Sequence, residues 1–217
     1  MAAAAVHARI QSQATSILQF WFGTAYPLNI QMRQMWFMKE AAIDERIRDA
    51  FGALVSDILD ADSSALLPLL HESQADVKVA TVLCLDQFTR NIYRDQPDAF
   101  SGDRVTQKFV MDTVDSPSAM RQIKQLHALA QGFFFMPLMH SEEAHVHDVA
   151  QRVYNDLVAE SVANPALHAT LTNFAKFELD HKVIIDRFGR YPHRNAILGR
   201  ESTPEEIAFL QQPNSSF

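Results

Sequence analysis

The residues with the clearest chemical potential lie in the stretch "RFGRYPHRNAILGR", from Arg187 to Arg200. It holds four arginines, one histidine and one asparagine, and it contains no carboxylate. Guanidinium groups bind carboxylates and phosphates through paired hydrogen bonds, so this composition is typical of an anion site. It is also typical of a loop whose side chains satisfy buried backbone groups. The candidate residues here are Arg190, His193, Arg194 and Asn195.

A second polar segment, "LDQFTRNIYRD", ends a stretch that is otherwise apolar from Val77 onward. Asp86 and Arg90 are four residues apart, and so are Arg90 and Arg94, which on a helix places each pair on one face. One interpretation is structural: the arginines stabilise a helix C-terminus and Asp86 forms an intrahelical ion pair. The other is an anion site formed by stacked guanidinium groups. The candidate residues are Asp86, Arg90, Asn91 and Arg94.

The segment "MPLMHSEEAHVHD" places a histidine beside carboxylates. Ser141 is typical of a helix N-cap, which puts Glu142 and Glu143 in a first turn that favours negative charge. His140, Glu143 and His147 are separated by three and four residues, a spacing that a divalent metal could use on a continuous helix. Because His140 precedes the expected cap, we predict no metal here. His140 and Glu142 stay candidates for a binding pocket.

His181 lies in the longest apolar stripe of the sequence, among Phe174, Phe177 and Ile185. A histidine in this setting is most often a core residue whose ring nitrogens bond within the protein. The alternative is a ligand or a general base, which needs a carboxylate within hydrogen-bond reach inside a cleft. We include His181 among the candidate binding residues, although its apolar setting favours the core.

Helices must position all of these residues. Apolar side chains recur at steps of three and four from Ile43 to Ile58 and from Leu167 to Phe188, which predicts amphipathic helices. Residues 77–85 are apolar almost all round, as in a buried helix. Period-two runs flanked by hairpin dipeptides are missing, so no strand pair is predicted. Capping residues precede prolines at Ser116-Pro117, Asn164-Pro165 and Thr203-Pro204, and Glu206 completes a capping box after Thr203.

The expected fold is all-α, a single domain over residues 1–217 with its core at about 10–211 and a short polar C-terminal tail. A chain of 217 residues is long enough to bury a substantial core without metals or disulfides. Its 47% apolar and 21% charged residues are typical of a globular protein. The lone cysteine, Cys84, lies in an apolar run and is predicted to be an inert core thiol in a reducing compartment.

The overall charge of the chain excludes some classes of binding partner. A net charge of −7 argues against broad nucleic-acid binding and against anionic membranes. The chain shows no signal peptide, and the apolar run "GFFFMPLM" is too short to span a bilayer, so we expect a soluble cytoplasmic protein. Phosphate-binding glycine loops and nucleophile elbows are missing, so no cofactor and no catalytic residue is assigned. The sequence leaves a homo-oligomer open.

Four segments together resemble a bacterial family known as domain of unknown function 924. They are "ILQFWFG", "LDQFTRNIYR" with "AFSGD", "FFMPLMHSEE" and "FGRYPHRNAILGRESTPEE". The resemblance implies a mostly helical, tetratricopeptide-like arrangement of stacked antiparallel hairpins, and it implies no activity, substrate or cofactor. The candidate residues named above are motif positions of this family, together with Gln87, Ser141, Arg187, Gly189, Pro192, Gly199 and Arg200.

Two departures from the family pattern bear on chemistry. Met139 stands where the family usually has glutamate, which weakens an acid–base role built on that glutamate. His145 and His147 replace apolar or amide residues, which further weakens the metal interpretation.

Three functional hypotheses follow. The first is a binding module whose arginines and histidines line a pocket for an anionic small molecule or a peptide terminus. The second is a structural or protein-interaction scaffold in which the polar motifs lock the C-terminal loop to the bundle. The third is a hydrolase or transferase with His140 or His181 as general base, Glu142 or Glu143 as acid, and arginines that stabilise a developing anion.

Overall fold

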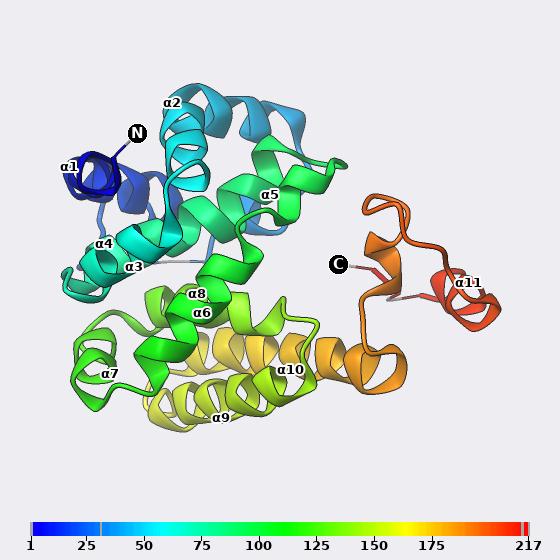
Figure 1. Ribbon diagram of the computed structural model, residues 1–217. Helices are drawn as coiled ribbons and strands as arrows, with labels where there is room; N and C mark the ends of the chain where they lie inside the picture. The colour runs from blue at the N-terminus through cyan, green and yellow to red at the C-terminus, as the bar shows by residue number, and fades with distance from the viewer. Residues whose placement is uncertain (1, 31, 214, 217) are drawn as a thin grey trace.

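The computed structural model describes residues 2–30, 32–213 and 215–216, so the two ends of the expected domain, Met1 and Phe217, lie outside the described residues. All regular secondary structure in these ranges is helical, which confirms the predicted all-α class. Figure 1 shows the arrangement. The α-helices are α1 (Ala3–Phe22), α2 (Ala41–Leu59), α3 (Ser63–His71), α4 (Ala75–Val82), α5 (Thr89–Ile92), α6 (Asp103–Val114), α7 (Pro117–Ile123), α8 (Ala128–Met139), α9 (Ala144–Glu160), α10 (Pro165–Phe188) and α11 (Pro204–Leu210). The other helical segments are η1 (Gln34–Trp36), η2 (Leu83–Phe88), η3 (Pro97–Phe100) and η4 (Pro192–Arg194).

The helix starts follow the capping chemistry of the sequence. The side chains of Ser116, Asn164 and Thr203 each accept a hydrogen bond from the backbone three residues on, as predicted. Thr203 and Glu206 form the complete capping box. The helix α10 ends at Phe188 and is capped by Gly189, whose φ of 68° lies in the left-handed region that glycine adopts without strain. Local side-chain chemistry therefore sets these helix ends.

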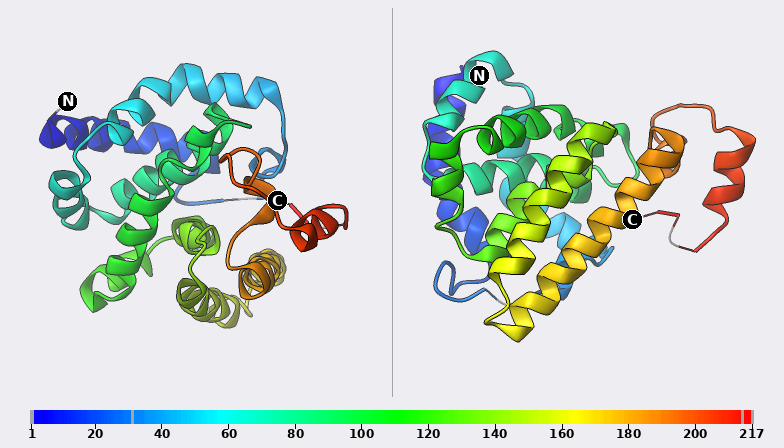
Figure 2. Two further views of the ribbon diagram at one scale, coloured as in Figure 1. Left: turned by 45° about the vertical axis from the view of Figure 1, so that its right-hand side comes forward. Right: turned by 90° about the horizontal axis from the view of Figure 1, so that it is seen from below.

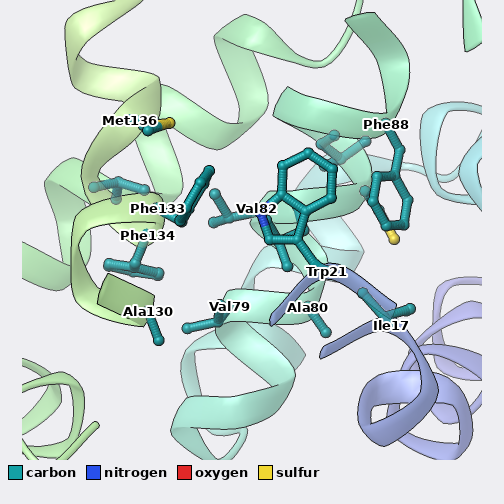
Figure 3. Close-up of a cluster of buried hydrophobic side chains, with 14 of the residues drawn as sticks. Ile17, Trp21, Val79, Ala80, Val82, Phe88, Ala130, Phe133, Phe134 and Met136 are labelled. Atoms are coloured by element: carbon teal, nitrogen blue, oxygen red, sulfur yellow. The ribbon is translucent and has the colours of Figure 1, made fainter. Parts of the chain in front are cut away.

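The core forms around α8. Every residue from Leu129 to Met139 is buried, because this helix contacts α4, α6, α9 and α10. Figure 3 shows Trp21 of α1 between Phe133 of α8 and Phe88 of η2, with ring centroids 5.5 and 5.7 Å away. Cys84 is fully buried, and burial raises the pKa of its thiol, so the predicted inert thiol is consistent with its surroundings.

One segment interrupts the long buried helix that the sequence predicts from Val77 onward. Between α4 and α5, Leu83–Phe88 form a π-helical segment with a wider turn. Side chains supply hydrogen bonds to its carbonyls: the Thr89 hydroxyl donates to the Leu85 carbonyl at 2.9 Å, and Arg90 Nη1 donates to the Asp86 carbonyl at 2.7 Å. The wider turn changes the angular position of every residue after it, including Arg90.

The helices form one bundle with a C-terminal extension (Figures 1 and 2). The helices α9 and α10 lie antiparallel and side by side, as in the expected hairpins, and α10 continues into the loop that carries η4. The short helix α11 lies beyond the end of α10. The likeness to tetratricopeptide repeats stays a prediction. Within the described ranges, every helix is too short or too polar to cross a membrane.

Candidate functional site

A central polar cluster joins residues of five elements, which come from four separate parts of the chain. It consists of Asp86 from η2, Arg90 from α5, Asp103 from the start of α6, His140 from the end of α8 and Arg194 from η4. His140 Nδ1 lies 2.7 Å from Asp86 Oδ1. Arg90 bridges the two carboxylates, with Nη2 3.0 Å from Asp103 Oδ2 and Nη1 3.3 Å from Asp86 Oδ1. The structure thus brings together four of the predicted residues around one unpredicted carboxylate, Asp103.

The protonation states of this cluster follow from burial and neighbouring charge. Burial of Asp86 disfavours its charged form, but the charge of Arg90, the charge that His140 gains in acid, and the hydrogen bonds from His140 and Gln87 outweigh it and hold the pKa of Asp86 well below the usual range. Burial lowers the pKa of His140, although Asp86 acts in the opposite direction. At neutral pH the cluster therefore contains an ionised Asp86 and a neutral His140.

Arg194 is the least satisfied member of the cluster. Its side chain is 7% exposed, and its guanidinium lies between Tyr191 and Phe100, with Cζ 4.5 and 4.7 Å from the two ring centroids. Nη1 donates to Asp103 Oδ2 at 3.3 Å, and Nε has no hydrogen-bond partner within the described part of the chain. Burial lowers its pKa, because Asp103 and other nearby carboxylates only partly offset the loss of hydration.

A cavity of about 550 Å³ opens beside His140 and Arg194. Phe100, Pro97 and Leu198 supply its apolar wall. Its polar lining comes from Ser101, Asp103, Arg104, Gln107, Lys108, His140, Ser141, Glu142, Glu143 and Arg194. It lies where the C-terminal loop meets the start of α6 and the end of α8, so the C-terminal motif and the histidine motif share one hollow.

Glu142 ties the C-terminal loop to the segment after α8. Its carboxylate accepts hydrogen bonds from the Tyr191 backbone at 2.9 Å and from Arg200 Nη1 at 2.7 Å. The Tyr191 hydroxyl donates to the Met139 carbonyl at 2.6 Å. The pKa of Glu142 is lowered, since Arg200 and the backbone donor outweigh burial. An acid role for Glu142 is therefore disfavoured, because its carboxylate is already ionised and occupied.

Arg190 and Asn195 lie on the far side of the same loop. Arg190 forms a bidentate pair with Glu206 of α11, with Nε–Oε1 at 2.7 Å and Nη2–Oε2 at 2.9 Å. Asn195 is 1% exposed and donates to Ser202 Oγ at 3.0 Å and to Glu206 Oε2 at 3.3 Å. These contacts lock α11 onto the loop, and neither residue lines the cavity.

The predicted face of stacked arginines is wrong. The helix α5 ends at Ile92, so Arg94 lies beyond it and is not one helical turn above Arg90. Arg94 instead pairs with Asp44 of α2, with Nε–Oδ2 and Nη2–Oδ1 both at 2.6 Å, and Asn91 donates to the same carboxylate at 2.8 Å. Asn91 and Arg94 therefore connect α5 to α2 and stand apart from the cavity.

The structure corrects the predicted N-cap at Ser141, and it also shows where His140, Glu143 and His147 lie, whose spacing raised the metal interpretation. The helix α9 begins at Ala144 after Glu143, and Ser141 accepts from the Glu143 backbone at 3.0 Å in the preceding turn. His140 belongs to the end of α8 and therefore shares no helical stripe with His147. Among the described residues no group of three or more metal-ligating side chains is close enough to hold an ion.

His147 and Glu178 form a fully buried pair between α9 and α10. His147 Nδ1 lies 2.9 Å from Glu178 Oε1, and Nε2 lies 2.9 Å from the Ser141 carbonyl. Nε2 must donate to that carbonyl, so one further proton is shared between Nδ1 and Glu178. Burial raises the pKa of Glu178, which fits a carboxyl group that shares this proton. The pair fastens the two helices and does not line the cavity.

His181 and His193 flank the central cluster. The His181 ring lies 6.0 Å from the His140 ring and 5.6 Å from the Tyr191 ring, and its Nδ1 donates to the Phe177 carbonyl at 2.7 Å. His181 is 5% exposed, as the core interpretation predicts, although Phe177 of the same predicted stripe is 43% exposed. The ring of His193 lies 5.5 Å from that of Tyr191.

We expect acid to destabilise the protein through His193. Burial and the neighbouring Arg194 lower its pKa to about 4, whereas the unfolded chain titrates near 6.5. The native state therefore binds fewer protons, and stability that is complete above pH 6.5 is lost as pH falls toward 4. The loss from this group reaches about 3 kcal/mol. Urea unfolding at pH 7.5 and 4.5 measures it: His193→Gln should reduce the difference, whereas the exposed His145→Gln should leave it unchanged.

Comparison with known proteins identifies the family of this chain. A sequence model of the family described as "Bacterial protein of unknown function (DUF924)" matches residues 17–214, and these include every segment of the site. The chain belongs to this family. The solved structure of a protein of unknown function, ATU0120 from Agrobacterium tumefaciens, is 28% identical, with a TM-score of 0.69 over 93% of this chain and 98% of that one. The search of curated proteins found no match.

The family motifs converge in space, but they also contain residues that the functional interpretation of the sequence missed. Asp103, Phe100 and Tyr191 surround Arg194, and none was predicted as a site residue. A signal existed, because "AFSGD" and "GRYPHRN" are family motifs that contain all three. Aromatic and acidic residues in such motifs can line a site or stabilise a fold, so their types alone did not reveal the role.

Proposed function

We propose that the cavity beside Arg194 binds a small molecule through a carboxylate, including the C-terminal carboxylate of a peptide. The main support is the guanidinium of Arg194, which lines the cavity, is 7% exposed and makes one 3.3 Å ion pair within the described residues. A buried charge with few partners is costly. Its Nε is too deeply buried to meet a ligand, so a bound carboxylate would accept hydrogen bonds from the terminal nitrogens of the guanidinium.

The charges around the cavity favour a singly charged ligand. Arg90 and Arg194 are balanced by Asp86 and Asp103, which leaves the central polar cluster neutral when His140 is neutral. The lining adds Glu142 and Glu143, and it also adds Arg104 and Lys108, so its positive and negative side chains balance. Glu142 already pairs with Arg200, and Lys108 pairs with Asp112. A ligand with a single negative charge suits this balanced lining better than a phosphate dianion does.

The size of the cavity agrees with a small ligand. Its volume of about 550 Å³ is typical of pockets for metabolites or short peptide ends. Phe100, Pro97 and Leu198 offer apolar contact beside the polar groups. The loop that forms one wall is fixed by the contacts of Glu142 with Tyr191 and Arg200, so the pocket is largely preformed.

Thermal unfolding with a panel of anions tests the proposal. The panel contains acetate, butyrate, inorganic phosphate, and one short peptide with either a free or an amidated C-terminus. A ligand at a hundred times its Kd adds about 2.7 kcal/mol, which raises Tm by roughly 5–10 °C for a chain of this size. We expect carboxylates to raise Tm more than phosphate, and the amidated peptide to have no effect.

Two matched arginine variants provide the control. Arg194→Gln should abolish the shift, because it removes the charge beside the cavity. Arg187→Gln should retain it, since Arg187 is 45% exposed and pairs with Glu205 on the surface. Carboxylate binding at this cavity is contradicted if no anion of the panel raises the Tm of the unmodified protein. It is also contradicted if carboxylates raise the Tm of Arg194→Gln as much as that of the unmodified protein.

A structural role suits the rest of the motif set. Arg190 and Asn195 hold Glu206, Arg94 and Asn91 hold Asp44, and Glu142 holds the loop through Tyr191 and Arg200. These pairs use most of their hydrogen-bonding groups within the protein, which suits the second hypothesis, although Asn195 Oδ1 and Arg200 Nε have no partner among the described residues. The C-terminal stretch thus combines a lock, made by Arg190 and Asn195, with one ligand-facing arginine, Arg194.

A further inference from the structure

His140 and Asp86 form a dyad at the edge of the cavity. Asp86 is fully buried and its Oδ1 lies 2.7 Å from His140 Nδ1, while Gln87 Nε2 donates to Oδ2 at 2.6 Å. The carboxylate is thus fixed from both sides, and it fixes the imidazole in turn. His140 lines the cavity, and its side chain is 15% exposed, whereas His181 is not part of the lining.

The dyad sets the tautomer of His140. An ionised Asp86 can only accept, so Nδ1 of the neutral imidazole carries the proton. Nε2 then holds a lone pair. In the part of the chain that the structure describes, Nε2 makes no hydrogen bond to the protein and is not among the buried unsatisfied atoms. It is therefore a proton acceptor open to the cavity, as a general base requires.

We propose that His140, oriented by Asp86, is the general base of a hydrolytic site for a carboxylate-bearing ester in this cavity. The inference rests on the proposed function, because Arg194 holds the carboxylate of the substrate. Nε2 takes a proton from water as the water oxygen bonds to the ester carbonyl carbon. The ester C–O bond then breaks, and the leaving alcohol oxygen receives that proton from Nε2. The products are an acid and an alcohol, and no redox partner is needed.

The charged surroundings of His140 determine its pH dependence. The groups that face it are Asp86, Arg90, Asp103, His181, His193 and Arg194. Burial and Arg90 disfavour the imidazolium, whereas Asp86 and Asp103 favour it, and the net effect lowers the pKa of His140 below 6.5. A reaction that needs unprotonated Nε2 should therefore rise with pH through a value below 6.5 and then level off.

Hydrolysis of the monoester of succinate with 4-nitrophenol provides the test, with neutral 4-nitrophenyl acetate as comparison. The full chain should hydrolyse the anionic ester faster, with kcat/KM at least tenfold above that of His140→Gln. His145→Gln, which alters a histidine whose side chain is 69% exposed, should retain the rate and its pH profile. Asp86→Asn should lower kcat while leaving KM nearly unchanged, which identifies Asp86 as a positioning residue.

A second measurement is independent of turnover and of the stability of the variants. Imidazole nitrogen NMR of the unmodified protein should show His140 as the Nδ1–H tautomer, with a shift of the Nε2 signal on addition of butyrate. If butyrate raises Tm but the ester is hydrolysed equally by His140→Gln, the hydrolytic inference is wrong and the binding function stands. If butyrate neither raises Tm nor shifts Nε2, both are wrong. An Nε2–H tautomer overturns the dyad by itself.

Discussion

Replacing Asp86 with alanine should lower the free energy of unfolding by about 3–5 kcal/mol, the range for removing one partner of a buried charge pair. Asp86 is fully buried, and its carboxylate contacts His140 at 2.7 Å and Arg90 at 3.3 Å. Without it, the His140 Nδ1–H has no acceptor, and the guanidinium of Arg90 depends on Asp103 alone. Urea unfolding at pH 7.5, followed by circular dichroism, measures the loss.

Two further aspartate variants distinguish the effect of the buried charge from the effect of replacing any aspartate. Asp86→Asn keeps an oxygen that can accept from His140 but removes the charge, so we expect a smaller loss than for alanine. Asp49→Ala alters an exposed residue of α2 and should change the free energy of unfolding by less than about 0.5 kcal/mol. If Asp86→Ala is as mild as Asp49→Ala, Asp86 does not hold the central polar cluster together.

Features that depend on near neighbours were predictable from the sequence. The capping box at Thr203 and Glu206 spans four residues, so its partners are visible in the sequence itself. The same holds for Asn164, the N-cap of α10, whose side chain accepts a hydrogen bond from the backbone three residues further along the chain. The apolar run of residues 77–85 predicted burial, because a helix that is apolar all round must be covered on all sides. The all-α class rests on many such local signals and was therefore predictable.

Features that depend on helix register were not predictable. A π-helical segment at Leu83–Phe88 has no clear sequence signal, yet it changes the direction of every side chain after it. The early end of α5 at Ile92 then sends Arg90 and Arg94 to different carboxylates, Asp103 and Asp44. Asp44 lies fifty residues from Arg94, and helical periodicity carries no information about which distant helices meet.

The site itself was predictable in part. Asp86, Arg90, His140 and Arg194 stood out because ionisable residues in apolar surroundings need partners or a function. The sequence could not show that His140 pairs with Asp86 instead of with the adjacent Glu142, since that choice depends on how α8 meets η2. It also could not show that the rings of Phe100 and Tyr191 lie against the guanidinium of Arg194, because these two residues come from separate segments of the chain.

Replacing Gly102 with alanine should destabilise the fold by about 3 kcal/mol, toward the upper end of what overpacking costs. A Cβ at this position would lie 2.1 Å from the backbone carbonyl oxygen of Leu85, and no side-chain rotation can separate the two atoms. The clash can be relieved only if α6 moves away from η2. Since Asp103 is the next residue, its contacts with Arg90 and Arg194 should lengthen as well. Urea unfolding gives the stability, and the shift in Tm on addition of butyrate reports on the cavity.

Gly52→Ala is the matched control, because the same methyl group is added in the middle of α2. There the new Cβ meets only the Cγ of the Arg48 side chain at 3.5 Å, an ordinary contact. Alanine is the better helix former, so this variant should gain about 0.5–1 kcal/mol. A loss at Gly102 together with a gain at Gly52 shows that the close approach of α6 to η2 is what demands glycine. Equal effects at both positions would mean that this approach is looser than 2.1 Å implies, and that Asp103 is held in place by its own ion pairs.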